Sequence, residues 1–177
     1  IVENRSMANQ EHVKAIKQGV HYWNKWREEN PDVVPDLAWA DLVGVDLNGA
    51  NLEGANMKLA FCRRGNLQGV NFKNATLYGI NLEESNLRGA NMEGASLEGA
   101  HLRKADLTAS NLRNTNMKLA NLQHATLTQA DLTGASKLTL EQFGEVKSLF
   151  ETKLDTKILD QINDLYPELL QETDSQD

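Results

Sequence analysis

A period of five residues runs without interruption through the middle of this chain. From Leu37 to Leu132 every fifth residue is large and apolar, which gives twenty consecutive positions. Fifteen of them are Leu, and the others are Met57, Cys62, Phe72, Met92 and Met117. This period matches neither the turn of an α-helix, about 3.6 residues, nor the alternation of a strand, about 2 residues. The chain must therefore change direction once in every repeat.

A coil with four short sides satisfies this requirement. Two residues before each large residue stands a small one, usually Ala, and the residue between them is most often Asn or Asp, as in Ala50-Asn51-Leu52. If the large and the small residue both point inward, twenty residues form one square coil, and stacked coils bury a narrow Leu/Ala core. Asn and Asp bond readily to nearby backbone at bends. Nine glycines lie two places after a large residue, where some turns require a positive φ.

The motif Ala-Asp/Asn-Leu-x-x, repeated from Ala40 to Gly134, resembles the pentapeptide-repeat family. This resemblance implies an all-β solenoid with α-helical caps, a right-handed quadrilateral β-helix of about five coils. Three flanking segments resemble the helical flanks of cyanobacterial members: Asn-Gln-Glu-His at 9–12, Trp-Asn-Lys-Trp-Arg-Glu-Glu-Asn-Pro at 23–31 and Leu-Tyr-Pro-Glu-Leu at 165–169.

The sequence predicts three segments. Residues 1–34 form an N-terminal capping helix and linker, residues 35–134 the β-helix, and residues 135–177 C-terminal capping helices with an acidic tail. Met7 is a plausible native start, so residues 1–6 are expected to lie outside the fold. One N-terminal helix is predicted from the N-cap Asn9 to Asn30-Pro31, with an apolar stripe of Val13, Ile16, Val20 and Trp23. Terminal caps are expected because a solenoid exposes backbone and core at both ends.

Two helices are predicted after the repeats. The first begins with a capping box, Thr139 and Gln142, and its apolar stripe is Leu140, Phe143, Val146 and Phe150. The second begins near Asp155 and ends around Tyr166-Pro167. Residues 172–177 are expected to be disordered.

Charge and composition exclude several classes of function. The net charge is -7, but residues 35–134 hold ten acids and nine bases, so most of the acidity lies in residues 135–177. Because no basic stripe is present, direct nucleic-acid binding is not expected. No apolar run is long enough to span a membrane, and the start lacks the features of a secretory signal. A cytoplasmic protein that binds neither membrane nor cofactor is the expectation.

Catalysis is not expected, because no phosphate loop, metal motif or nucleophile motif is present. Cys62 occupies a central inward position and is interpreted as core. Glu83-Glu84 lies one coil from Arg63-Arg64 and one coil from Arg103-Lys104, which predicts a ladder of alternating charge. A second alternating column is predicted from Glu53, Lys73, Glu93 and Arg113.

Two surface features fit a protein partner. Trp39 and Leu59 share one outward column beside Tyr78, and together they predict an apolar patch. The alternative is that the N-terminal helix covers Trp39. A second column, Gly49, Gly69 and Gly89, ends in Ala109 and offers a smooth strip to another backbone. The alternative here is that these glycines only satisfy turn geometry.

The sequence thus favours a non-catalytic interaction or scaffold protein, a monomer or small homo-oligomer, whose protein partner it does not identify. The runner-up rests on the resemblance: some members of the family inhibit DNA gyrase by imitating DNA with an acidic rod. A DNA-mimicking regulator of a type II topoisomerase therefore remains the alternative, although the near-neutral repeat region argues against it.

Overall fold

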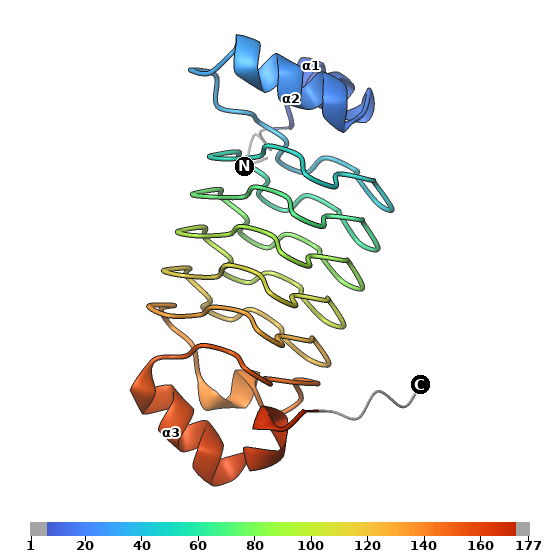
Figure 1. Ribbon diagram of the computed structural model, residues 1–177. Coiled ribbons are helices and arrows are strands. Elements are labelled where there is room, and N and C mark those ends of the chain that lie inside the picture. The colour runs from blue at the N-terminus through green and yellow to red at the C-terminus, as the bar shows by residue number, and fades with distance from the viewer. Residues whose placement is uncertain (1–6, 173–177) are drawn as a thin grey trace, which may run out of the picture.

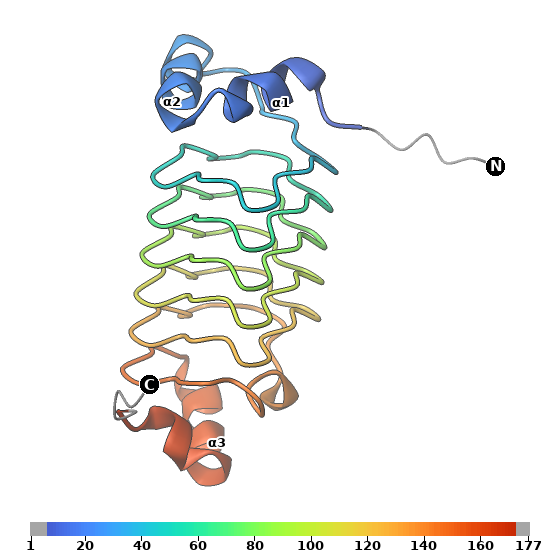
Figure 2. The ribbon, with the colours of Figure 1, turned by 90° about the vertical axis from the view of Figure 1, so that its right-hand side faces the viewer.

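The computed structural model describes residues 7–172. A rod of stacked coils occupies the centre, with helices at either end (Figures 1 and 2). The N-terminal helices are α1 (Gln10–Lys17) and α2 (Val20–Glu29). After the rod come the 3-10 helix η1 (Leu140–Gln142), the helix α3 (Thr156–Leu165) and the 3-10 helix η2 (Pro167–Leu170). The expectations for residues 1–6 and 173–177 lie outside the described residues.

Parallel pairing between residues twenty apart builds the rod. Bridges run from Asp36↔Asn56 to Asn116↔Ser136, one on each side of each coil. Within residues 7–172 each side contributes an isolated bridge rather than a longer strand. A typical bridge has two backbone hydrogen bonds, from the N–H of Leu37 to the C=O of Asn56 and from the N–H of Asn56 to the C=O of Pro35, both 2.8 Å. Pairing of this kind recurs from coil to coil and satisfies these bridging backbone groups within the rod.

The interior is a continuous column of aliphatic side chains. All twenty central residues from Leu37 to Leu132 are buried, Leu87 and Leu107 completely, so the predicted inward orientation is confirmed. The residues two places earlier, mostly Ala, share this core.

The bends use the residues that the sequence indicated. Asn51 Oδ1 accepts a hydrogen bond from the N–H of Glu53 at 3.2 Å, and the same contact recurs wherever Asn or Asp precedes the central residue. The third residue after this position has a positive φ, at Gly89 (63°) and also at Arg64 (58°). Glycine therefore suits the bend, but other residues also adopt its conformation.

The N-terminal cap differs from the single helix predicted. The chain breaks at Gly19, whose φ of 106° is outside the helical range, and forms two helices that meet the first coil at different places. Trp23 is fully buried over the core and stacks on Trp26, with ring centroids 5.1 Å apart. The apolar spacing continues across the break, which is why it suggested one helix.

The C-terminal cap also differs from the prediction. The helix expected from Thr139 is only η1, although the capping-box contact is present: the Gln142 side chain accepts from the Thr139 N–H at 2.9 Å. The chain then rejoins the rod through the bridges Thr126↔Ser148 and Asp131↔Lys153. The second predicted helix is confirmed as α3.

Candidate protein-binding surface

Trp39, Leu59 and Tyr78, the residues predicted to form an apolar patch, lie near one another on the rod. The N–H of Trp39 donates to the C=O of Lys58 and the N–H of Leu59 to that of Tyr78, both at 2.9 Å, so the three outward side chains lie on successive coils. Tyr78 is 43% exposed, and Trp39 and Leu59 are partly buried. Leu59 lies over Gly79, where an added Cβ would approach Leu59 Cδ2 to 2.6 Å.

The sequence analysis missed Phe61, which extends this patch around the corner. Phe61 is 44% exposed and occupies the position before a central residue, where Asn or Asp usually caps the bend. It bridges to Asp41, two residues before the exposed Val43. The sequence could have indicated Phe61, since a phenylalanine at this position cannot make the local hydrogen bond that Asn or Asp makes. The apolar residues on both sides of this corner are called the corner patch: Trp39, Val43, Leu59, Phe61 and Tyr78.

The glycine column is open. Gly49, Gly69 and Gly89 have φ of 70°, 60° and 63°, and a Cβ added to any of them would meet nothing within 4 Å. Ala109 continues the column with a φ of 57°. The backbone conformation is sufficient to explain the glycines. At the first coil the Asn24 side-chain amide donates to the C=O of Gly49 at 3.0 Å.

Alternating charges neutralise the side that follows the corner patch. Arg63 and Arg64 both bind Glu84, at 2.6 and 2.7 Å, and Arg103 lies 3.4 Å from Glu83. The hydrogen bonds from the two arginines lower the pKa of Glu84 to about 2. Arg63 also lies 3.7 Å from Glu83, so the predicted ladder is confirmed.

The second predicted column pairs less regularly. Lys73 lies 3.8 Å from Glu93, but Arg113 reaches Asp131 at 3.3 Å on the next coil. Glu53 accepts a hydrogen bond from the amide of Asn71 at 3.2 Å. Bonds to neighbouring acids and amides thus replace part of the expected ladder.

The side chains that could be reactive or bind a metal show no arrangement that supports either role in the described residues. Cys62 is completely buried, and burial raises the pKa of its thiol to about 12. Among residues 7–172 no three His, Cys, Asp or Glu side chains are grouped as a metal site. Nor does this part of the chain contain a helix of the length and apolar character that crossing a membrane requires.

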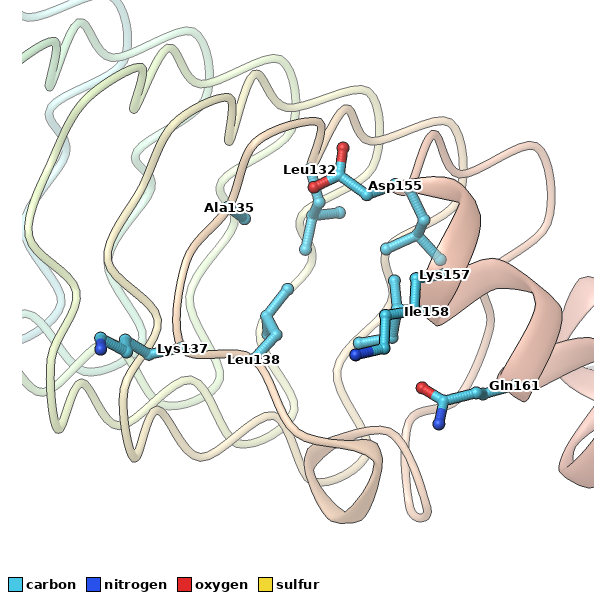
Figure 3. Close-up of a pocket in the computed structure, with 9 residues that line it drawn as sticks. Leu132, Ala135, Lys137, Leu138, Asp155, Lys157, Ile158 and Gln161 are labelled. Atoms are coloured by element: carbon cyan, nitrogen blue, oxygen red, sulfur yellow. The ribbon is translucent and has the colours of Figure 1, made fainter.

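A cleft of about 260 Å³ lies between the last coil and α3. Figure 3 shows Leu138 and Ile158 on facing sides of it. The Asp155 carboxylate accepts the N–H of Gly134 at 3.1 Å and so ties the start of α3 to the coil. The cleft is the space that this attachment leaves over the end of the core. Its lining residues are Leu132, Ala135, Lys137, Leu138, Leu154, Asp155, Lys157, Ile158 and Gln161.

The family model for pentapeptide repeats matches residues 36–64, 66–103 and 100–136, in eight copies, more than half of the chain. The chain belongs to the pentapeptide-repeat family. Members of this family form right-handed quadrilateral β-helices, and the bridges between residues twenty apart match that fold. Among curated proteins none matches at a significant level.

Solved structures similar to this pentapeptide-repeat chain include cyanobacterial proteins. The pentapeptide repeat protein Rfr23 from the cyanobacterium Cyanothece 51142 is 29% identical, with a TM-score of 0.53, over 75% of this chain and 90% of Rfr23. The protein alr5209 from Nostoc Pcc 7120 is 25% identical, with a TM-score of 0.36, over 65% and 84% of the two chains. QnrB1, a plasmid-mediated fluoroquinolone resistance protein, is 18% identical, with a TM-score of 0.34, over 70% and 84%.

Proposed function

We propose that this pentapeptide-repeat protein is a non-catalytic, cytoplasmic protein-binding module, and that the corner patch contacts its partner. The observation that carries this proposal is Phe61, an exposed aromatic at a position where fifteen of the twenty repeats have Asn or Asp and the other four have Thr, Ser or His. A residue that departs from the local rule without an evident structural gain is a candidate for function.

The composition of the corner patch supports the proposal. Aromatic residues are enriched at the energetic centres of protein interfaces, and the patch contains the aromatic residues Phe61 and Tyr78 besides aliphatic ones. Lys58 Nζ lies 5.4 Å from the centroid of the Tyr78 ring, so a cation sits at the rim of the patch. The rigid coils hold these side chains in place before a partner arrives, which reduces the entropy lost on binding.

The gyrase alternative has less support from the structure. A DNA mimic needs a continuous acidic surface, and Glu83 and Glu84 are each paired with arginine. A supercoiling assay separates the two functions: inhibition of gyrase by the purified protein at stoichiometric concentration would support the DNA mimic and contradict our proposal.

Photocrosslinking tests the corner patch directly. A photoreactive phenylalanine analogue at position 78 should capture a protein from the source cells, and Phe61→Asn should abolish the capture. The matched control is Leu165→Asn, which removes another exposed apolar side chain, 60% exposed, at the opposite end of the molecule. The captured protein should then bind the purified chain with the same dependence on Phe61. Equal capture by the Phe61 variant would contradict the proposed surface.

A further inference from the structure

The first coil, residues 35–54, has no preceding coil to pair with, whereas every later coil has one. In the second coil, residues 55–74, the N–H of Phe61 donates to Ala40 at 2.9 Å and its C=O accepts from Leu42 at 2.8 Å. Both groups point toward the N-terminal end of the rod. The equivalent groups of the first coil also point that way and have no preceding coil to meet.

The N-terminal segment supplies partners on two of the four sides. On the side of Asp36, the C=O accepts from the N–H of Asn9 at 3.0 Å and the N–H donates to His12 Nδ1 at 2.9 Å. On the side of Asn51, the N–H donates to Asn24 Oδ1 and the C=O accepts from Trp23 Nε1, both at 2.8 Å. Both helices of the cap lie over this end of the rod (Figures 1 and 2).

The other two sides remain open between residues 41 and 48. Within residues 7–172, the N–H groups of Asp41 and Asp46 and the C=O groups of Asp41, Val43, Asp46 and Asn48 have no protein partner. All four residues are exposed, Val43 by 58%. We call residues 41–48 the uncovered edge. It presents two donors and four acceptors in the arrangement that pairs one coil with the next.

The uncovered edge is also acidic. The first coil contains the four acids Asp36, Asp41, Asp46 and Glu53 and no Lys or Arg, whereas the second contains four bases and no acid. Asp46 Oδ1 accepts from its own turn, the N–H of Asn48 at 3.1 Å, and from the amide of Asn66 below it at 3.0 Å. In the next two coils of this column Asn66 and Asn86 each donate toward the preceding coil. Asp at the end of this column can only accept, so a segment added above it must bring donors.

We propose that the uncovered edge binds an extended segment of a protein partner that carries lysine or arginine. Addition of an extended peptide to an open edge supplies main-chain hydrogen bonds, and the carboxylates of Asp41 and Asp46 select for positive charge. The same charges keep two copies of this edge apart when no partner is bound. This inference does not rest on the corner patch, although Asp41 bridges to Phe61 and the two surfaces adjoin.

Fluorescence polarisation with a labelled peptide, Thr-Lys-Thr-Val-Thr-Lys-Thr, tests the proposal on the intact protein. Two matched peptides serve as controls: one has Glu in place of Lys, and one keeps both lysines but is N-methylated at alternate residues. Loss of two or three main-chain hydrogen bonds should weaken binding about tenfold or more. The Glu peptide should not bind. If the methylated peptide binds equally well, or if no peptide binds at millimolar concentration, the proposal is wrong.

Protein variants locate the contact. Asp41→Asn with Asp46→Asn keeps the bend contacts, because interior coils use Asn there, and should weaken binding about three- to tenfold. The control, Asp160→Asn with Asp164→Asn, makes the same change in charge on α3 and should leave affinity unchanged. Equal effects would mean non-specific attraction and would overturn the proposal. The proposal would also be overturned if the protein bound the peptide only after residues 1–6 were deleted, since those residues would then be what binds the uncovered edge. Crosslinking at Tyr78 tests the corner patch independently.

Discussion

Replacing Phe61 with Asn separates a residue retained for binding from one retained for stability. Burying a whole phenylalanine side chain contributes about 1.5–3 kcal/mol. Because Phe61 is 44% exposed, its covered part contributes about half of that, roughly 1–1.5 kcal/mol. Asn at this position should accept the N–H of Arg63, as Asn81 accepts that of Glu83 at 3.1 Å. It should also donate to Asp41, as Asn66 does to Asp46 at 3.0 Å.

These two new hydrogen bonds offset the lost apolar contact. Partly exposed bonds of this kind contribute about 0.5–1 kcal/mol each, so Phe61→Asn should change the free energy of unfolding by less than about 1 kcal/mol. Urea unfolding followed by circular dichroism measures the change. The reference is Leu82→Ala in the core of the same side, which should cost about 2–5 kcal/mol. A loss of about 3 kcal/mol or more in the Phe61 variant would show that Phe61 is structural, and the argument for the corner patch would fail.

Four further predictions follow from the core, the charges and the caps. Leu87→Ala, at a fully buried position, should lower the free energy of unfolding by about 2–5 kcal/mol in urea titrations. Cys62, buried with its pKa raised to about 12, should resist alkylation by iodoacetamide at pH 8 until the protein is unfolded, and rapid labelling of the native protein would contradict this. The pKa of Glu84 is lowered from 4.5 to about 2, so the pairing of its carboxylate stabilises the fold above the unfolded-state pKa. This stabilisation should be lost as the pH falls from about 4.3 toward 2. Glu84→Gln should remove this part of the pH dependence of stability, and a carbon NMR titration of Glu84 measures the pKa. Deleting residues 1–34 should cause concentration-dependent association, seen by light scattering, because the first coil loses Trp23 and the rest of its cap.

The sequence was sufficient to predict the rod, because one short rule determines both its core and its bends. The central residue fixes what is buried, and the preceding Asn or Asp fixes where the chain turns. Since each coil repeats the same backbone contacts, a residue that departs from the repeat at one position, such as Phe61, does not alter the register of the coils. The charge ladder from Arg63 to Arg103 followed from the same spacing of twenty.

The caps were harder to predict because different structures share similar apolar spacing. Residues on either side of Gly19 continue one helical stripe, but α1 contacts the side of Asp36 and α2 the adjacent side of Asn51, and the chain breaks between them. After Thr139 the stripe suggested a helix, whereas Leu149 and Leu154, five residues apart, mark a return to the coil. The bridge partners there are twenty-two residues apart rather than twenty, so the period was hidden.

The binding surfaces depend on contacts between coils and caps that no local rule describes. The sequence identified Trp39 and Leu59 from their shared column and Tyr78 beside it, but not Phe61, whose significance lies in the bond it fails to make. The uncovered edge could not be predicted, because it is defined by where the N-terminal helices stop.

Because the repeat is uninterrupted, the number of pentapeptides also sets the angle about the rod axis between its two ends. Adding or removing twenty residues would lengthen or shorten the rod and preserve every column. A change of five residues would instead turn everything that follows by a quarter of a revolution, while each coil kept the same core and the same bends. Family members could thus vary the orientation of their two ends in four discrete steps without redesigning a single contact inside a coil, and a surface spanning several coils would be cut and displaced at the point of insertion.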